Sequence, residues 1–277
     1  MLAILSLVSA LVLPSRMGVP RMALVDDFSI SKDIKTVQVF DGDYAKEICD
    51  EVAAVGAACI AEKDSFSLAI PGGSVVTAIA GLSPDALDYS KVHLFLCNEK
   101  IPSFPCYSGA LEVAKKLGIP EKQVYGVDTK GTPAELAASY SKVLASNPSI
   151  DNSGPIPSVD MMLLGTGPDG HVGCLFPDSP EIKASGTGKV VVAGNDARAN
   201  GDFLAVTMDV MCAAKVVLVS AAGAGRADMV AKALSGDFGR FDCPAGMVEG
   251  IEQTLWFTTQ DALEKFDAMA EDEEMEE

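Results

Sequence analysis

Residues 159–177 read Val-Asp-Met-Met-Leu-Leu-Gly-Thr-Gly-Pro-Asp-Gly-His-Val-Gly-Cys-Leu-Phe-Pro, where a short apolar run breaks into a glycine-rich turn. The run at 161–164 is apolar throughout and ends at a glycine, which predicts a strand buried on both faces of a parallel sheet. Ligands of open α/β sheets bind beyond the carboxyl ends of the strands. The turn at 165–171 is therefore predicted to lie at the catalytic edge of the sheet.

Two side chains of this turn are suited to chemistry. His171 is one of only 2 histidines in the chain, and an imidazole with an ordinary pKa near 6.5 can take a proton from water at neutral pH. Asp169 is placed to orient the turn or the histidine, and Gly170 lets the backbone approach a ligand closely. A histidine that caps a turn or lines a pocket wall is the alternative, but the Gly-Pro-Asp-Gly-His context favours a catalytic base.

A second glycine turn follows an earlier strand. The strand predicted at 67–70 runs into Pro71-Gly72-Gly73-Ser74, after which a helix is predicted at 75–81. Free backbone N–H groups and the helix dipole converge at such a junction, so Gly72, Gly73 and Ser74 are candidates for binding an anion.

A third polar group comes after the strand predicted at 92–97. Its carboxyl end delivers Asn98, Glu99 and Lys100 to the same edge as the Gly-Gly-Ser turn, and we expect all three to contact the substrate. His93 lies in the middle of this strand and is expected to be packed rather than catalytic.

Strand and helix signals alternate along the rest of the chain. Further strands are predicted at 36–40, 189–193, 203–208, 215–220 and 254–257, and further helices at 43–62, 132–146, 226–234 and 261–269. Asp43 is predicted to cap the first of these helices, and Thr132 and Glu135 form a capping box. The alternation predicts an α/β fold with an open, mostly parallel, Rossmann-like sheet and helices on both faces.

The glycine-histidine turn resembles the signature of the 6-phosphogluconolactonases, which reads approximately G-x-G-x-D-G-H-x-x-S-L-F-P. Three further blocks agree in order and spacing, and the resemblance extends over about residues 37–262. These blocks are Pro71-Gly72-Gly73-Ser74, Asn98-Glu99-Lys100-Ile101-Pro102, and Thr207-Met208-Asp209-Val210-Met211 followed by Ala213-Ala214-Lys215.

The resemblance implies hydrolysis of 6-phospho-D-glucono-1,5-lactone to the open acid, without a metal or cofactor. His171 would activate a water as general base, and Asp169 would orient the turn or the histidine. The backbone N–H groups of the glycine turns would stabilise the oxyanion. The phosphate would be held by Gly73, Ser74, Lys100 and Arg198, the last identified by counting back from the Thr207 block.

The chain departs from the family pattern at Asn98, Lys100, Gly109 and Phe203, where that pattern has an aspartate, an arginine, an asparagine and a basic residue. Lysine supplies a point charge in place of a two-pronged fork, which would weaken the grip on a phosphate. A phosphosugar-binding or regulatory relative that has lost most catalysis is therefore an alternative. The related glucosamine-6-phosphate deaminases are less favoured, because they usually show Phe-Asn-Glu-Pro where this chain has Leu-Phe-Pro.

Composition narrows the classes of partner. The formal net charge of −18 over 277 residues argues against nucleic acid, since phosphate backbones need clustered lysine and arginine. The 7 cysteines contain no C-x-x-C pair, which indicates reduced thiols and no metal site. We expect one domain at 31–268, an acidic solvated tail at 269–277, and a monomer or weak homodimer.

The first 30 residues are predicted to be a targeting presequence. The apolar run at 2–13 carries no charge and is too short to span a bilayer, but it has the length of a signal-peptide core. An apolar run followed by basic residues resembles the two-part presequences of secondary plastids. Plastid targeting is thus expected, with a cytoplasmic location as the alternative and no membrane segment in the mature form.

Overall fold

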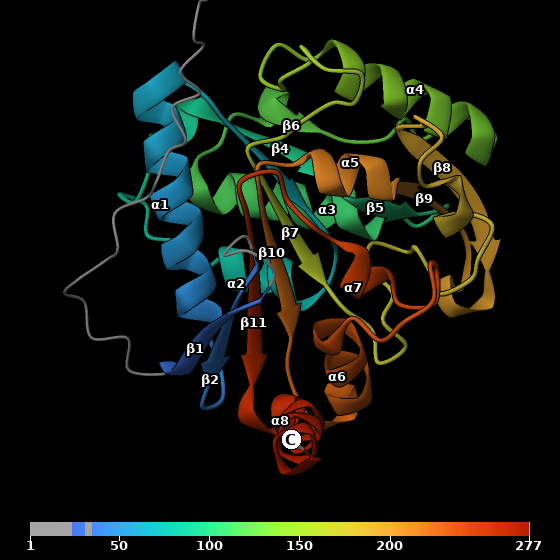
Figure 1. The fold of residues 1–277 in the computed structure, drawn as a ribbon. Helices are drawn as coiled ribbons and strands as arrows, with labels where there is room; N and C mark the ends of the chain where they lie inside the picture. Colours follow the sequence, from blue (N-terminus) through green and yellow to red (C-terminus); the bar gives the residue numbers. More distant parts are fainter. Residues whose placement is uncertain (1–23, 31–34, 277) are drawn as a thin grey trace, which may run out of the picture.

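An eight-stranded sheet carries the core of the protein in this computed structural model, which describes residues 24–30 and 35–276 (Figure 1). The strand order is β1-β2-β11-β10-β7-β3-β4-β6, and every neighbouring pair is parallel except β1 with β2. The strands are β1 (Leu24–Ile30), β2 (Lys35–Phe40), β3 (Phe66–Ile70), β4 (Val92–Leu96), β6 (Val124–Tyr125), β7 (Met161–Gly165), β10 (Val216–Ala221) and β11 (Gln253–Thr259). The predicted open, mostly parallel α/β sheet is confirmed.

The central position of β7 follows from its sequence. Its first four residues, Met161 to Leu164, are all fully buried, between β10 on one side and β3 on the other. A strand that is apolar on both faces loses no hydrophobic contact in the middle of a sheet covered by helices. Its last residue, Gly165, delivers the signature turn to the carboxyl edge.

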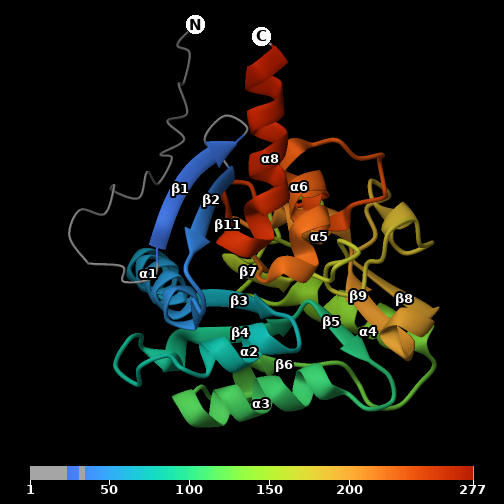
Figure 2. The ribbon, with the colours of Figure 1, turned by 90° about the horizontal axis from the view of Figure 1, so that it is seen from below.

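Helices cover both faces of this sheet, as predicted (Figures 1 and 2). On one side lie α1 (Ala45–Lys63), α2 (Ser74–Ile79) and α3 (Pro105–Leu117), each in a connection between parallel strands. On the other lie α4 (Pro133–Ser146), α5 (Met208–Ala213), α6 (Ala227–Ser235), α7 (Pro244–Met247) and α8 (Gln260–Glu276). The two sides correspond to connections that run in opposite directions along the sheet, as right-handed crossovers require.

A second, three-stranded sheet lies beside the first and was not foreseen from the sequence. It consists of β5 (Asn98–Lys100), β8 (Val191–Asp196) and β9 (Gly201–Val206), paired antiparallel in the order β5-β9-β8. Strands near 189–193 and 203–208 were predicted, and they pair with each other locally as β8 and β9, but β5 joins β9 from a distant part of the chain, at Asn98–Lys100. This sheet brings β5 and the segment around Arg198 to the site.

Helix ends follow the sequence in most places. The capping box of α4 is confirmed: Thr132 Oγ1 accepts from the N–H of Glu135 at 3.4 Å, and Glu135 Oε2 accepts from the N–H of Thr132 at 2.8 Å. Gly236 ends α6 in the left-handed conformation. The predicted cap position of α1 is off by one residue: Tyr44 occupies it, and Asp43, one residue earlier, accepts from the N–H of Ala45, the first residue of the helix.

At both ends, regular secondary structure extends beyond the boundaries predicted for the α/β domain. Residues 24–30, which the sequence grouped with the presequence, form β1 and pair with β2. The helix expected to end at residue 269 continues to Glu276 as α8, so much of the predicted acidic tail is helical. The apolar run at 2–13 lies outside the described residues. Within the described part of the chain, no helix combines the length and apolar character needed to cross a bilayer.

Candidate active site

A cavity of about 430 Å³ opens where β3 and β7 end, beside β5, and it gathers most of the residues singled out from the sequence. Seven of the predicted site residues line it: Gly72, Gly73, Ser74, Asn98, Lys100, His171 and Arg198. The rest of the lining comes from Pro71, Pro105, Cys106, Gly165, Thr166, Gly173, Cys174, Phe176 and Ala199. Segments more than 120 residues apart in the chain therefore meet at one edge.

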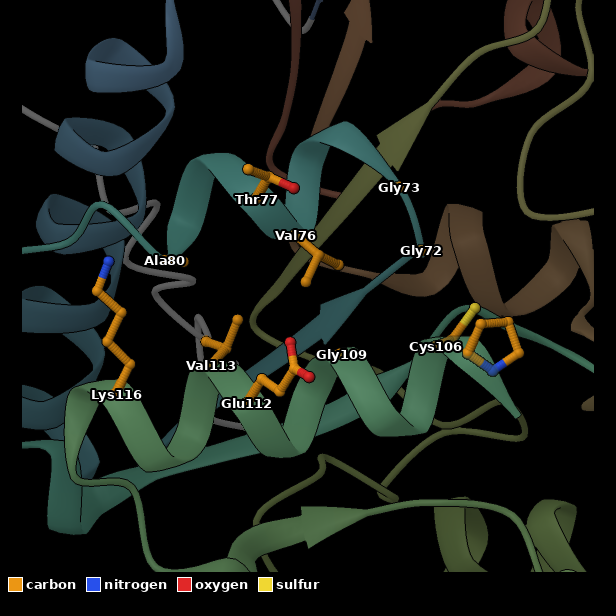
Figure 3. A pocket seen from close by; sticks show the side chains of 11 residues that line it. Gly72, Gly73, Val76, Thr77, Ala80, Cys106, Gly109, Glu112, Val113 and Lys116 are labelled. Atoms are coloured by element: carbon orange, nitrogen blue, oxygen red, sulfur yellow. The ribbon is translucent and has the colours of Figure 1, made fainter. Parts of the chain in front are cut away.

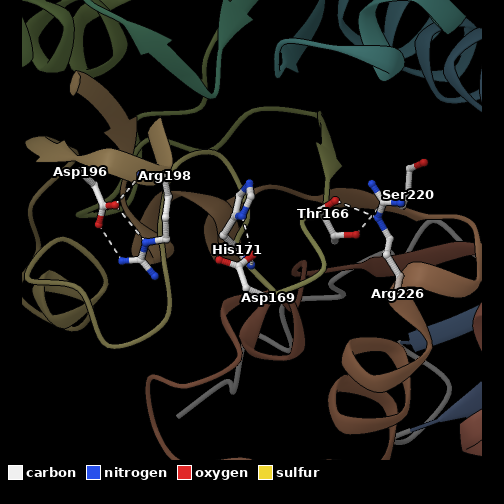
Figure 4. Close-up of polar contacts among 7 residues, drawn as sticks. All are labelled: Thr166, Asp169, His171, Asp196, Arg198, Ser220 and Arg226. Atoms are coloured by element: carbon white, nitrogen blue, oxygen red, sulfur yellow. Dashed lines mark hydrogen bonds and ion pairs between the residues drawn. The ribbon is translucent and has the colours of Figure 1, made fainter. Parts of the chain in front are cut away.

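His171 and Asp169 form a pair in the turn after β7 (Figure 4). His171 Nδ1 lies 2.6 Å from Asp169 Oδ1, and both side chains are about one-third exposed. An ionised carboxylate can only accept a hydrogen bond, so Nδ1 carries the proton and Nε2 is left as the basic nitrogen. The pair thus has the arrangement of a general base oriented by a carboxylate.

The glycines of the turn let the histidine ring lie close to the backbone. A Cβ atom at Gly167 would come within 2.2 Å of the His171 ring and 2.6 Å of Asp169 Oδ1. Gly170 has φ of 82°, a conformation that side chains disfavour. Although Asp169 and Gly170 do not line the cavity, they hold the residue that does.

Arg226, at the start of α6, braces the same turn and was missed from the sequence (Figure 4). Its Nε donates to the carbonyl of Thr166 at 3.0 Å and its Nη1 to that of Ala222 at 2.7 Å. Thr166 in turn donates through its N–H and its hydroxyl to the carbonyl of Ser220. The signal that could have revealed Arg226 is an arginine after Ala-Ala-Gly-Ala-Gly at the end of a buried strand, β10.

The Gly72–Gly73 turn leaves backbone donors open to the cavity. Gly73 has φ 78° and ψ −147°, a region accessible essentially to glycine alone. A Cβ at Gly72 would come within 2.9 Å of Cys106 Sγ, so this position also has no room for a side chain. Among the described residues, no protein acceptor receives the N–H of Gly72 or of Gly73.

Side-chain alternation along β5 divides the predicted group Asn98, Glu99 and Lys100. Asn98 and Lys100 are two residues apart on a strand, so they lie on the same face, and both line the cavity. Glu99 points to the opposite face and is 0% exposed. Its carboxylate accepts from the N–H groups of Lys100, Cys106 and Tyr107 at 2.7–3.0 Å. The expectation that Glu99 contacts substrate is therefore wrong, and Glu99 instead caps α3.

Phe176 lies between the histidine and the candidate phosphate ligand Arg198. Its ring centroid is 4.7 Å from that of His171 and 4.4 Å from the guanidinium carbon of Arg198. Phe176 also packs edge-on against Phe203 of β9, and the two ring centroids are 6.0 Å apart. Phe203 is fully buried, so position 203 contributes packing beneath the site rather than a charge in it.

Arg198 is held by a second carboxylate (Figure 4). Its Nε and Nη2 donate to Asp196 Oδ1 and Oδ2 at 3.0 and 2.6 Å. These bonds lower the pKa of Asp196 to about 2 and raise that of Arg198 above its ordinary value. Asp196 occupies one edge of the guanidinium, which leaves the Nη1–Nη2 edge for a ligand.

Two thiols form the wall behind Asn98. Cys174 and Cys106 both line the cavity, and both are buried. Burial raises the pKa of Cys174 to about 11 and raises that of Cys106 still further, so both are neutral at physiological pH. Within the described part of the chain, no three His, Cys, Asp or Glu side chains are grouped so that they could hold a metal ion.

A neighbouring cavity of about 360 Å³ lies between α2 and α3 and shares Gly72, Gly73, Pro105 and Cys106 with the first (Figure 3). Gly109 lines this cavity and not the one that contains His171. A Cβ at Gly109 would be 3.5 Å from Val76, an ordinary contact distance. The departure at Gly109 therefore lies beside the candidate active site rather than in it.

A histidine–carboxylate pair and two cations at the carboxyl edge of a parallel sheet are suited to proton transfer on a small anionic ligand, which defines the class of protein. A family model described as glucosamine-6-phosphate isomerases/6-phosphogluconolactonase matches residues 41–256. The chain belongs to this family.

Individual relatives agree with this assignment. A 6-phosphogluconolactonase of Mycobacterium tuberculosis is 30% identical over 226 residues, which cover 77% of this chain and 90% of that protein. A probable chloroplastic 6-phosphogluconolactonase of Oryza sativa subsp. japonica is 28% identical over 246 residues, covering 81% and 74%. The structure of 6-phosphogluconolactonase from Trypanosoma brucei matches with a TM-score of 0.69 at 23% identity, covering 82% of this chain and 97% of that one.

Proposed function

We propose that the protein hydrolyses 6-phospho-D-glucono-1,5-lactone to 6-phosphogluconate, a step of the oxidative pentose phosphate pathway. The observation that carries this proposal is the His171–Asp169 pair, at 2.6 Å, in a cavity that also contains Lys100 and Arg198. A lactone is an ester, and its hydrolysis needs an activated water and a place for the negative charge that develops on the carbonyl oxygen. The named relatives support the same reaction.

His171 acts as the general base. With Nδ1–H donating to Asp169, Nε2 takes a proton from water as the water attacks the lactone carbonyl, and it returns the proton to the ring oxygen when the C–O bond breaks. A positioned base of this kind contributes a rate factor of about 10² to 10⁴. Asp169 stabilises the imidazolium between the two steps, as a carboxylate paired with a histidine does in other hydrolases.

The phosphate of the substrate is held by Lys100 and Arg198, with Ser74 and the Gly73 backbone. Arg198 presents its Nη1–Nη2 edge because Asp196 occupies the other edge. A protein of net charge −18 repels an anion on average, so these two local cations, with Ser74 and the N–H of Gly73, determine binding of the phosphate.

The oxyanion is stabilised by a backbone N–H group that has no protein acceptor, from the Gly72–Gly73 turn or from the turn after β7. In the latter, the N–H groups of Thr166, Gly167 and Gly170 already donate to protein carbonyls. Gly173, which follows His171 by two residues and lines the cavity, donates its N–H to no protein acceptor among the described residues, so Gly72 and Gly173 are the candidate oxyanion donors. A single preorganised donor contributes about 2.7 to 4 kcal/mol in well-studied sites.

The test is hydrolysis of freshly generated 6-phosphogluconolactone, with the spontaneous reaction subtracted and His171→Ala alongside. We expect kcat to fall about 10²- to 10⁴-fold in the variant while the protein melts at an unchanged temperature. His93→Ala is the matched control, because His93 lies in β4 beside Tyr125, away from the cavity. Absence of turnover in the wild-type protein, together with binding of 6-phosphogluconate, would establish the non-catalytic phosphosugar-binding alternative.

Targeting to a plastid is a further part of this proposal. It is supported by the apolar run at 2–13, which Arg16 and Arg21 follow, and by the chloroplastic name of the rice relative. Residues 1–30 fused to a fluorescent protein should direct it to plastids in a cell with secondary plastids. Fluorescence that stays in the cytoplasm would contradict the plastid assignment and leave the reaction unaffected.

A further inference from the structure

The side-chain amide of Asn98 is held by two sulfur atoms in the cavity wall. Its Nδ2 lies 3.2 Å from Cys174 Sγ and 3.8 Å from Cys106 Sγ. Cys174 belongs to the signature turn and Cys106 to the first turn of α3, so the amide is held between two separate elements. Each sulfur accepts weakly from the Nδ2 group, and the two contacts together place the Nδ2 end of the amide against the wall.

The other end of the amide is unused within the protein. Among the described residues, no donor contacts Asn98 Oδ1, although the side chain lines the cavity. An amide carbonyl is an acceptor only, and leaving an acceptor without a partner once a ligand excludes water is costly. Asn98 Oδ1 therefore has no donor within the described part of the protein, and any partner that a ligand supplies must be a donor.

The neighbouring charges decide which part of a phosphosugar supplies the donor. A fully ionised phosphate has only acceptor oxygens, so it cannot satisfy Asn98 Oδ1 and is drawn instead to Lys100 and Arg198. A hydroxyl of the sugar ring can donate to an amide carbonyl. Because Lys100 lies on the same face of β5 as Asn98, two residues away, one ligand can contact both.

We propose that Asn98 Oδ1 accepts a hydrogen bond from a ring hydroxyl of the substrate, and that Cys174 and Cys106 are positioning residues that orient the amide for it. This inference rests on the proposed function, since it assumes a phosphosugar ligand. Neutral thiols suit the role, because thiolates at these positions would repel the phosphate. Burial, which raises the pKa of both thiols, keeps them neutral.

The test is a double-mutant cycle in which the dissociation constant for 6-phosphogluconate is measured for each variant. Asn98→Leu removes the acceptor at similar volume and should weaken binding about 10-fold, and Cys174→Ala should weaken it about 3-fold by freeing the amide. In the Asn98→Leu background, Cys174→Ala should have no further effect. Cys174→Ser retains an acceptor and should bind like the wild type, as should Cys59→Ala, a control distant from the cavity.

Inorganic phosphate is the probe that separates this inference from general damage to the site. Its binding should be the same in Asn98→Leu and wild type, because only the sugar hydroxyl is lost. Equal weakening for both ligands, or additive effects in the cycle, would overturn the inference. If Asn98→Leu does not fold, Asn98→Ala replaces it.

The outcomes also separate this inference from the proposed function. Binding of 6-phosphogluconate without lactone turnover would refute the enzyme and still test Asn98. A wild-type protein that binds no 6-phosphogluconate would refute both.

Discussion

Two aspartates lie close to opposite ends of β7, and their surroundings differ sharply. Asp160, just before the strand, is 1% exposed. Its Oδ2 accepts from the N–H and hydroxyl of Ser67 at 2.8 Å each, and its Oδ1 lies 2.8 and 3.4 Å from the ammonium groups of Lys63 and Lys215. Asp169, after the strand, is 38% exposed, and its carboxylate contacts the ring and the N–H of His171.

The difference separates the part of the protein that maintains the fold from the part that carries the chemistry. At the amino end, one carboxylate ties α1, β3, β7 and β10 together and is closed to ligands. At the carboxyl end, loops keep their polar groups accessible to a substrate. A substitution at the first aspartate should therefore affect stability, and one at the second should affect turnover.

Asp160→Asn should produce the largest effect on the free energy of unfolding. The change leaves two lysines without their counter-charge and should cost about 3 kcal/mol, the lower end of the range for a broken buried pair because both lysines can reach water. Urea unfolding measures the loss, and kcat per folded molecule should be unchanged. Asp64→Asn, which removes an exposed carboxylate paired with Lys91, is the control and should cost under about 1 kcal/mol. A large loss of kcat in Asp160→Asn would contradict this division.

Asp169→Asn should lower kcat and leave the free energy of unfolding nearly unchanged, the reverse of Asp160→Asn. Because the amide cannot stabilise an imidazolium and can bind the wrong tautomer, kcat should fall about 100-fold, equivalent to about 2.7 kcal/mol of transition-state stabilisation. The free energy of unfolding should change little. Asp178→Asn, a nearby exposed change, should leave kcat intact. Equal kcat for Asp169→Asn and wild type would show that the carboxylate is dispensable for orientation.

Phe176→Leu tests the aromatic ring that contacts both His171 and Arg198. Losing its contacts with His171 and Arg198 should lower kcat/KM about 10-fold, since each such contact contributes about 1 kcal/mol or less. Phe66→Leu, at the amino end of β3, is equally buried and should reduce stability similarly without lowering kcat/KM. The idea fails if both variants lose kcat/KM to the same extent.

Asp196→Asn should have the smallest effect, a rise in KM of about 3-fold, because an exposed pair contributes little and only Arg198 is loosened. The pKa of Asp196 is lowered to about 2 from the ordinary 3.8. The ion pair is therefore complete above about pH 4 and is lost only as the pH falls through about 2. The KM ratio of variant to wild type should accordingly be equal at pH 5 and pH 8, and a ratio that disappears at pH 5 would contradict this assignment.

The predictions from sequence succeeded where one local stretch carries the information. The Asp169–His171 pair lies within a single glycine-rich turn, so the signature marks it, although Arg226 and Ser220 also hold that turn. Ser74 lies near it because parallel strands deliver their ends to one edge, whereas Arg198, identified by counting back from the Thr207 block, reaches the cavity on the connection between β8 and β9 of the antiparallel sheet. Glu99 was misplaced because a short strand at 98–100 turns alternate side chains to opposite faces, and nothing local marks that strand.

Arg226 and Asp160 show a different limit. Each acts through atoms far away in the chain: Arg226 through the carbonyl of Thr166, and Asp160 through Ser67, Lys63 and Lys215. A single sequence carries no measure of such distances. Their roles could be recognised only once β7, β10 and β3 had been placed side by side.

The sequence by itself determined the parallel α/β sheet, the buried strand β7, the capping box of α4 and the turn that presents His171, because each depends on periodicity or on glycine conformation within a few residues. The tertiary structure alone decided the second sheet, the burial of Glu99, the thiols behind Asn98, and the contacts of Phe176 with His171 and Arg198. Those features depend on which surfaces meet after folding, and contacts between distant segments are determined by packing of the whole chain rather than by the preference of any one segment.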